Sequence, residues 1–271
     1  MSKVLKNKMK LVDDSEIIEE TEKELEIKTR IKSPLSTLFY NINSVFTDNY
    51  PAKMPMDFAR DMIELYSEKG NVVWDGCGGS GTVARATARL GRIAVYSDVN
   101  EKAVDLAVKL AEQENLDTKN YYCDDARTFD FVSISTGKPD LILSSLPFGL
   151  NIIGDKNHYS ENKNDISNSK DMKDFFKNSK QIIQSYFDNL SPNGIMILDA
   201  RDRFYQRQTI WLILEFAKIA QEIGFEPVTR YYYQLIPYRQ MTYIDKESAK
   251  VKAMPSAMDV IVLRKPAQAK L

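Results

Sequence analysis

Short apolar runs and amphipathic stretches alternate along the chain from residue 57 onward. Apolar side chains at helical spacing predict helices, and runs of β-branched and aromatic residues predict strands. The predicted helices span residues 57–67, 80–90, 100–115, 170–190 and 208–223, and the predicted strands span residues 71–75, 92–97, 119–123, 140–144, 194–199, 226–234 and 257–264. This alternation indicates an α/β fold with a Rossmann-like, doubly wound, mostly parallel sheet. The last two strands lack a helix between them, so we expect an antiparallel C-terminal hairpin at an edge of the sheet.

The first part of the chain differs from the rest. Residues 1–33 are rich in charge and poor in aromatic side chains, which predicts a mobile arm or a solvated helix. Residues 34–271 are expected to form one domain. Its first part, residues 34–55, contains aromatic side chains and the pair Pro51 and Pro55, so we expect it to be ordered but irregular.

The composition narrows the functional class. The chain has 271 residues and is 43% hydrophobic, which is ample for a core. No apolar run approaches the roughly 18 residues of a membrane span, and the N-terminus lacks the apolar core of a secretory signal. Cys77 and Cys123 are the only cysteines, which favours a reducing cytoplasm over a disulfide framework. The single histidine, His158, argues against most metal sites and against His-based triads, so no metal is expected.

The charge is nearly balanced overall but uneven along the chain. The net charge of −1 gives no broad basic excess of the kind that phosphate binding usually requires. Between Arg201 and Lys265, eleven basic residues stand against seven acids, which permits a local basic face. Between Asp13 and Glu26 the bias reverses, with eight acids and one lysine.

A glycine-dense turn follows the predicted strand at residues 71–75. It reads Asp75-Gly76-Cys77-Gly78-Gly79-Ser80-Gly81-Thr82. Glycines let the backbone bend sharply and let a ligand approach closely. Asp98 ends the next apolar run, and an acid about 20 residues beyond such a turn typically binds ribose hydroxyls. Together the two features predict a site for a nucleotide-type cofactor, with a purely structural β–α turn as the alternative.

Polar residues also end the other predicted strands. In doubly wound sheets, ligands bind outside the carboxyl ends of the strands. A site there would be surrounded by the side chains of Asp75, Asp98, Asp125, Ser145 and Asp199. The alternative is that strand ends are simply polar.

The segment Ser145-Leu146-Pro147-Phe148 suits an exocyclic amine as substrate. The amine lone pair is delocalised into the ring of a base. If the Ser145 hydroxyl and the Leu146 carbonyl accept its two N–H protons, the nitrogen can approach tetrahedral geometry and attack a methyl group. Phe148 would stack on the base. Orientation would carry much of the rate, so no histidine is needed.

These motifs resemble those of S-adenosylmethionine-dependent DNA methyltransferases that make N6-methyladenine or N4-methylcytosine. The family's cofactor loop usually reads Asp-Pro-Phe-x-Gly-Ser-Gly-Thr, and residues 75–82 are similar to it. The family's catalytic motif reads Asp/Asn/Ser-Pro-Pro-Tyr/Phe, and residues 145–148 are similar to that. A Pro-x-x-x-Pro stretch at residues 51–55 and a last strand at residues 257–265 extend the resemblance to roughly residues 45–265.

The resemblance implies a class I methyltransferase domain with S-adenosylmethionine as cofactor and DNA as partner. It implies cofactor-binding roles for Pro51, Lys53, Pro55, Asp75, Gly76, Cys77, Gly79, Gly81, Thr82, Asp98, Val99, Asp125, Ala126 and Ser145. Of these, Asp98 would bind the ribose hydroxyls and Asp125 would lie near the adenine amine. Catalytic roles are implied for Ser145, Leu146, Pro147 and Phe148. We expect nucleic-acid contacts from Arg201, Arg203 and Arg239, with a surface ion-pair cluster as the alternative for the first two.

Two residues depart from the family's catalytic motif. Leu146 replaces a proline and reduces the stiffness of the backbone. Ser145 in place of aspartate favours the N4-cytosine branch. One alternative is an RNA amino-methyltransferase, because Gly149 follows Phe148 as in related enzymes that act on RNA. Another is a non-catalytic, cofactor- or nucleic-acid-binding subunit of a heteromeric enzyme. A homodimer or a partner subunit stays open.

Overall fold

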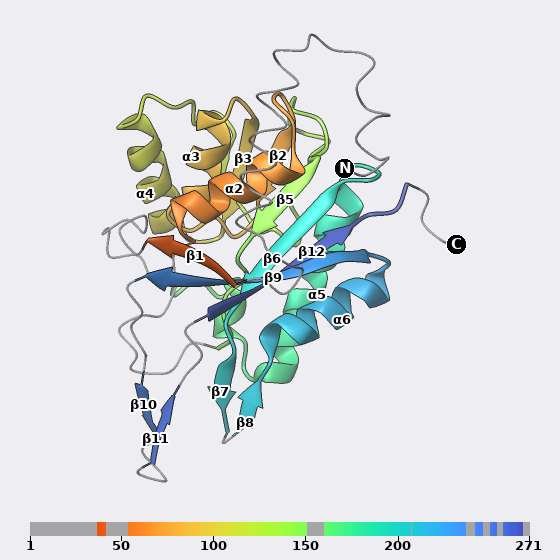
Figure 1. Ribbon diagram of the computed structural model, residues 1–271. Coiled ribbons are helices and arrows are strands. Elements are labelled where there is room, and N and C mark those ends of the chain that lie inside the picture. Colours follow the sequence, from red (N-terminus) through yellow and green to blue (C-terminus); the bar gives the residue numbers. More distant parts are fainter. Residues whose placement is uncertain are drawn as a thin grey trace, which may run out of the picture.

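The computed structural model describes residues 37–41, 54–150, 160–206, 208–236, 242–245, 250–253 and 257–267. Within this part of the chain an eight-stranded sheet forms the centre of the molecule (Figure 1). In spatial order its strands are β1 (Thr37–Asn41), β9 (Glu226–Ile236), β12 (Ala257–Arg264), β6 (Ile195–Ala200), β5 (Leu141–Ser144), β2 (Val72–Asp75), β3 (Ile93–Asp98) and β4 (Tyr121–Cys123). Only β12 runs antiparallel to its neighbours, β6 and β9. The predicted doubly wound, mostly parallel sheet with an antiparallel C-terminal pair is therefore confirmed.

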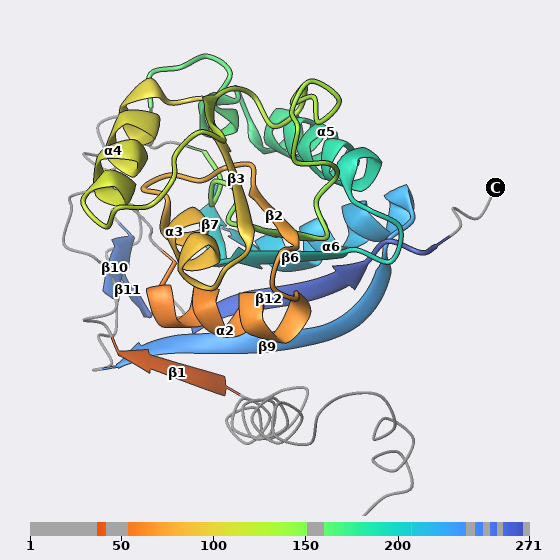
Figure 2. The same ribbon diagram turned by 90° about the horizontal axis from the view of Figure 1, so that it is seen from above.

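Helices cover both faces of this sheet (Figure 2). On one face lie α2 (Met56–Tyr66) and α3 (Thr82–Arg89), and α4 (Glu101–Glu112) packs beside β3 and β4. On the other face lie α5 (Met172–Asn189) and α6 (Leu212–Ile223). Successive side chains of a strand point to opposite faces, so the sheet supports two separate apolar cores. Among the described residues, no helix has both the length and the apolar character that crossing a bilayer requires.

The predicted helix over residues 208–223 is too long at its start. In the structure α6 begins at Leu212, and residues before it form a small antiparallel hairpin of β7 (Arg203–Tyr205) and β8 (Gln208–Ile210). Aromatic and β-branched residues favour extended backbone in this segment. Gln206 has a positive φ of 46° at the turn, which ends any helical run there.

The expected position of the C-terminal hairpin also needs correction. Strands β9 and β12 pair antiparallel as predicted, but they do not form the edge of the sheet. Strand β1 pairs parallel with β9 and becomes the edge strand. The sequence predicts an irregular segment over residues 34–55. The Thr-Leu-Phe-Tyr stretch within it nevertheless has high strand propensity, and it forms a strand by pairing with the exposed edge of β9. A second small hairpin, β10 (Thr242–Asp245) with β11 (Lys250–Ala253), precedes β12.

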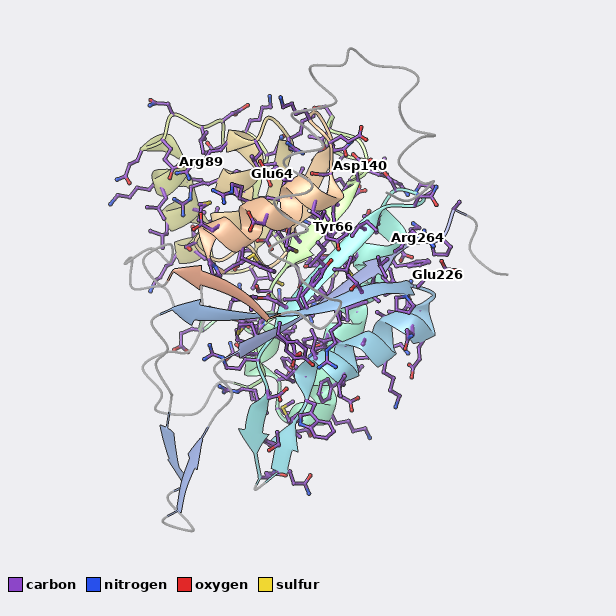
Figure 3. The ribbon with its side chains drawn as sticks, in the orientation of Figure 1. Glu64, Tyr66, Arg89, Asp140, Glu226 and Arg264 are labelled. Atoms are coloured by element: carbon purple, nitrogen blue, oxygen red, sulfur yellow. The ribbon has the colours of Figure 1, made fainter. Side chains whose placement is uncertain are left out.

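Polar contacts fix the register of strands at the amino end of the parallel sheet. The Asp140 carboxylate precedes β5 and accepts a 3.0 Å hydrogen bond from the backbone of Val72, the first residue of β2. Arg264 and Glu226 lie opposite each other where β12 meets β9, and their side chains form a 3.1 Å ion pair (Figure 3). Both contacts lie away from the carboxyl ends, which leaves those ends free to carry the site.

An aromatic cluster holds β2 in the core. Trp74 is fully buried, with 0% exposure, and stacks on Phe129 at 5.2 Å between ring centroids. Phe131 and Tyr186 meet the same indole edge-on at 4.9 and 4.8 Å. The indole Nε1 donates a 3.1 Å hydrogen bond to Ser97 on β3, so its polar atom is satisfied. This packing fixes the residue that immediately precedes Asp75.

Gly81 allows α3 and α4 to approach each other. It precedes α3 with a φ of +75°, and a Cβ atom on it would lie 2.8 Å from the Cβ of Ala107 on α4. Gly91 has a matching φ of +73°, but the nearest atom to its added Cβ would be Lys69 Cγ at 4.0 Å. The two glycines therefore adopt the same left-handed backbone conformation, but only at Gly81 would an added Cβ atom clash with a neighbouring helix.

We expect Gly81→Ala to lower the free energy of unfolding by about 2–5 kcal/mol, because it adds a clash to the left-handed backbone. Gly91→Ala should lower it by only about 1–2 kcal/mol, the backbone effect alone. Urea unfolding of both variants without ligand measures the difference. Equal losses would show that helix crowding at Gly81 is unimportant.

Candidate cofactor and catalytic site

The loop after β2 is held by a chain of buried hydroxyls. Ser144, the last residue of β5, donates a 2.8 Å hydrogen bond to the Asp75 carboxylate. Tyr186 of α5 donates in turn to Ser144 at 3.0 Å. The backbone N–H of Cys77 also donates to Asp75, at 3.3 Å. Burial dominates this environment and raises the pKa of Asp75 to about 7, against the lowering effect of these hydrogen bonds.

Two glycines of the loop are required by the packing of aromatic side chains around it. A Cβ atom on Gly78 would lie 2.2 Å from the ring of Tyr96, and one on Gly76 would lie 2.5 Å from the Tyr186 hydroxyl. The Tyr96 hydroxyl donates a 2.8 Å hydrogen bond to the carbonyl of Gly79. The loop is therefore built around its glycines before any ligand is considered.

Asp98 lies at the carboxyl end of β3 and faces this loop. Its two carboxylate oxygens accept hydrogen bonds from the backbone of Gly79 at 2.9 Å and of Asn100 at 2.8 Å. Burial raises the pKa of Asp98 to about 6. Each oxygen keeps further acceptor capacity, which could bind a pair of ribose hydroxyls.

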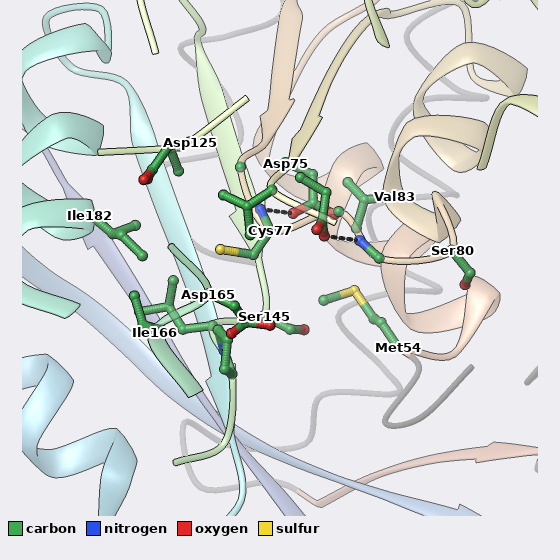
Figure 4. A pocket seen from close by; sticks show the side chains of 18 of the residues that line it. Met54, Asp75, Cys77, Ser80, Val83, Asp125, Ser145, Asp165, Ile166 and Ile182 are labelled. Atoms are coloured by element: carbon green, nitrogen blue, oxygen red, sulfur yellow. Dashed lines mark hydrogen bonds between the residues drawn. The ribbon is translucent and has the colours of Figure 1, made fainter. Parts of the chain in front are cut away.

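One pocket at the carboxyl ends of the strands brings most of the predicted residues together (Figure 4). Its wall includes the predicted Asp75, Gly76, Cys77, Gly79, Thr82, Asp98, Val99, Asp125, Ala126, Ser145, Leu146, Pro147 and Phe148. Two residues predicted to bind the cofactor are described but are not on this wall: Gly81 packs against α4, and Pro55 precedes α2. Pro51, Lys53 and Arg239 lie outside the described residues.

Several wall residues were not predicted. They are Met54, Gly78, Ser80, Val83, Asn164, Asp165, Ile166 and Ile182. Three of them belong to a segment around the short 3-10 helix η3 (Ile166–Asn168), which the Asn162 side chain ties to the backbone of Val99 with a 2.6 Å hydrogen bond. The polar Asn- and Ser-rich sequence of this segment predicts only a loop. The Asp165 carboxylate is the one local signal, because it caps η3 through the backbone of Ser167 at 2.9 Å.

The charge of the pocket matches a cationic cofactor. Its wall carries four carboxylates, and the described lining residues include no lysine or arginine. A dinucleotide pyrophosphate would be repelled by such a wall, whereas the sulfonium and ammonium groups of S-adenosylmethionine would be attracted. Apolar Val99, Ala126, Ile166 and Ile182 could cover an adenine ring. The residues present therefore fit S-adenosylmethionine.

Asp125 has a partner that was not predicted. Its carboxylate binds the guanidinium of Arg127 through several hydrogen bonds, including contacts of 2.9 and 3.0 Å to Nε. Arg127 also donates to the carbonyl of Asn164 at 3.0 Å, next to η3. Asp125 thus lies on the pocket wall as expected, and it also links this wall to the segment that carries η3.

Ser145 contacts a buried acid on the neighbouring strand. Its hydroxyl donates a short hydrogen bond to Asp199 of β6. The second oxygen of Asp199 accepts a 2.8 Å hydrogen bond from the hydroxyl of Tyr233 on β9. Burial raises the pKa of Asp199 to about 6, while the two hydroxyl donors act in the opposite direction. Since the Ser145 proton points to Asp199, the lone pairs of its oxygen are available to a substrate donor.

The rest of the catalytic motif packs into the protein. Leu146 is buried in the core beneath α5 and α6, which explains an apolar side chain at this position. Phe148 is half-buried and contacts both cores while it lines the pocket. Cys77 is partly buried against the same core as Leu146, and burial raises the pKa of its thiol. A neutral thiol fits a packing role better than a nucleophilic one.

Of the two predicted basic residues that the structure describes, Arg201 and Arg203, the second contacts the loop of residues 145–150 that follows β5, here called the catalytic loop. Its guanidinium donates a 3.2 Å hydrogen bond to the carbonyl of Leu150. A Cβ atom on Gly149, whose φ is +99°, would lie 3.4 Å from Arg203 Cγ. Arg201 is half-buried. Within the part of the chain that the structure describes, no group of histidine, cysteine and acidic side chains could hold a metal ion.

Comparisons with known proteins concern the family and the fold. A sequence profile of the family described as DNA methylase matches residues 4–109. Among solved structures, TrmN from Thermus thermophilus is similar in fold, with a TM-score of 0.50 and 18% identity. The match covers 79% of this chain and half of that chain. An rRNA methylase from Streptococcus thermophilus has a TM-score of 0.49 and 16% identity over 79% of this chain and 98% of that one. Comparison with curated protein sequences gives no match.

The fold and the acid-lined pocket define a class I methyltransferase domain with S-adenosylmethionine as its cofactor. Within this class, the profile match supports the resemblance to the amino-methyltransferases. The matched residues include the glycine loop and end before the Ser-Leu-Pro-Phe motif.

We expect Asp98→Asn to weaken S-adenosylmethionine binding by roughly 10- to 100-fold, because the substitution removes a charged acceptor. The affinity of the unmodified protein should increase between about pH 5 and about pH 8 as Asp98 and Asp75 lose their protons. Titration calorimetry measures both effects, with the exposed Asp117→Asn as a control. An Asp98→Asn variant that binds normally would exclude this residue from the cofactor site.

Proposed function

We propose that the protein transfers a methyl group from S-adenosylmethionine to the exocyclic amine of a flipped base in DNA, with cytosine N4 slightly favoured over adenine N6. The observation that carries this proposal is the hydrogen bond that Ser145, on the wall of the pocket, donates to buried Asp199. This pair gives a neutral serine the acceptor character that an amine substrate needs. The DNA methylase profile supports the choice of polymer.

The geometry suggests how the chain's own residues act. When bound, S-adenosylmethionine supplies an electrophilic methyl group. Ser145 accepts one amine proton in a hydrogen bond, because its own proton is held by Asp199. The Leu146 carbonyl would accept the second, and Phe148 would hold the plane of the base. As the nitrogen gains a methyl group it becomes acidic, and its excess proton can pass through Ser145 to Asp199.

The identity of residue 145 bears on the base. A carboxylate at this position accepts a hydrogen bond more strongly than a hydroxyl does. Here the carboxylate belongs to Asp199 on the neighbouring strand. It lies one hydrogen bond beyond Ser145 and would act on the substrate only through the Ser145 hydroxyl. This arrangement supports the N4-cytosine branch that serine already favours by resemblance.

An RNA amino-methyltransferase is the second candidate function, and its sequence signal is Gly149. The structure offers a local reason for this glycine, since its φ of +99° disfavours a residue with a side chain. Gly149 therefore does not by itself favour RNA. Leu146, which motivates a non-catalytic subunit, has a similar local reason in its burial.

The test is incubation of the full chain with S-adenosylmethionine carrying a labelled methyl group and mixed-sequence DNA or RNA, followed by analysis of nucleosides by chromatography and mass. Label in N4-methylcytosine or N6-methyladenine from DNA is the expected result and identifies the base. Label confined to RNA would move the proposal to that polymer. Absence of label in both, with cofactor bound, would overturn the proposal in favour of a non-catalytic subunit.

Ser145→Ala should reduce kcat by at least about 100-fold while cofactor affinity changes little, because the hydroxyl is proposed to act on the amine. The matched control is Ser144→Ala, which alters the adjacent hydroxyl that holds Asp75. That variant should weaken cofactor binding more than it lowers kcat. Labelled-methyl transfer at saturating cofactor, together with calorimetry, measures both parameters. An unchanged kcat in Ser145→Ala would remove Ser145 from the reaction.

The pH dependence of kcat should report on Asp199. Its carboxylate holds the Ser145 proton only when ionised, so kcat should rise with pH through about 6 and then level off. Asp199→Asn should lower kcat by roughly 10- to 100-fold and abolish this rise. Tyr233→Phe removes a hydrogen bond that lowers the pKa of Asp199, so the rise should move to higher pH. A profile that is identical in all three proteins would contradict the role of Asp199.

A further inference from the structure

The two tryptophans of the chain have opposite environments. Trp74 is completely buried, whereas the side chain of Trp211 is 59% exposed. Trp211 immediately precedes α6, and only its backbone carbonyl takes part in the first turn of that helix, through Leu214 and Glu215. Trp211 thus leaves a large part of an amphipathic indole accessible to solvent, and such a ring can stack on a planar ligand.

The position of Trp211 is close to the catalytic end of the sheet. Strand β6, which carries Asp199, leads within a few residues into β7, and Ile210 of β8 pairs with Arg203 of β7. Trp211 therefore lies at the base of the β7–β8 hairpin, opposite the residues that directly follow β6. Figure 1 shows this hairpin projecting from the body of the domain.

The surrounding sequence has the charge that a polyanion requires. Residues 201–211 contain three arginines and one acid. Arg203 bridges the hairpin to the catalytic loop through the Leu150 carbonyl. At the two-residue turn, Gln206 adopts a positive φ where asparagine or glycine is normally found. Backbone strain of this kind is often retained at functional surfaces.

We propose that Trp211 is a stacking platform for an unpaired base of the substrate strand, next to the base that enters the catalytic pocket. The proposal rests on the proposed function, because it requires a nucleic-acid substrate. Aromatic side chains combined with arginines are the usual elements that hold single-stranded nucleic acid, and stacking tolerates any sequence. The link between Arg203 and Leu150 makes this surface continuous with the catalytic loop.

The two tryptophans make the proposal directly measurable. On titration with single-stranded oligonucleotides, DNA and RNA separately, the fluorescence of exposed Trp211 should be quenched while that of buried Trp74 should stay constant. Trp211→Phe should remove most of the quenching. Trp211→Ala should raise the Kd roughly 5- to 100-fold. The control is Leu214→Ala, which removes an apolar side chain that is 42% exposed one turn along the same surface helix and should leave the Kd unchanged.

The outcomes separate this proposal from the proposed function. An unchanged Kd in Trp211→Ala, with no quenching in the unmodified protein, would overturn the stacking role even if methyl transfer to nucleic acid is observed. If Trp211→Ala instead abolishes self-association in sedimentation experiments and leaves the Kd unchanged, the surface is a protein contact and the proposal is wrong. Quenching and weakened binding without any methyl transfer would support the platform and overturn only the proposed reaction. Thermal unfolding confirms that each variant is folded.

Discussion

Two consecutive serines at the end of β5 connect the site to both neighbouring strands. Ser144 donates to Asp75 on β2, and Ser145 donates to Asp199 on β6. Strand β5 lies between β2 and β6 in the sheet, so one short segment can contact a buried carboxylate on each neighbouring strand. The first of these contacts fixes the loop that surrounds the cofactor pocket. The second places an acceptor where a substrate amine would enter. The cofactor pocket and the Ser145–Asp199 pair are thereby fixed relative to each other through a single strand.

The site concentrates acids that are costly to bury. Asp75, Asp98 and Asp199 are all nearly inaccessible, and burial raises the pKa of each. The cost of burying each carboxylate is offset by hydrogen bonds from hydroxyl or backbone N–H donors. Neutral donors hold the carboxylates in place without cancelling their charge. Asp75 and Asp98 therefore give the pocket wall negative charge when they are ionised, whereas Asp125 on the same wall is paired with Arg127.

Much of the site could be predicted because its signals are local in sequence. The glycine loop, Asp98 and the Ser-Leu-Pro-Phe motif each follow an apolar run, and the ends of parallel strands must meet. The pairing of Ser145 with Asp199 could not be predicted, since it depends on which strands become neighbours. Strand β1 was missed because five residues give a weak periodic signal and its stability comes from pairing with β9. The η3 segment was missed for the opposite reason: its polar sequence has no periodicity, and its place over the pocket depends on contacts such as Asn162 with Val99.

The insertion between β6 and α6 has a consequence for substrate selection. Strand β6 does not lead directly into a helix. Here the chain first forms β7 and β8, and Arg203 returns to hold the backbone of Leu150. The same hairpin thus supports the catalytic loop and extends the surface beside it. A polymer that bound this hairpin would reach residues 145–150 through this hydrogen bond, so on the proposed function its binding would be coupled to the alignment of the catalytic loop.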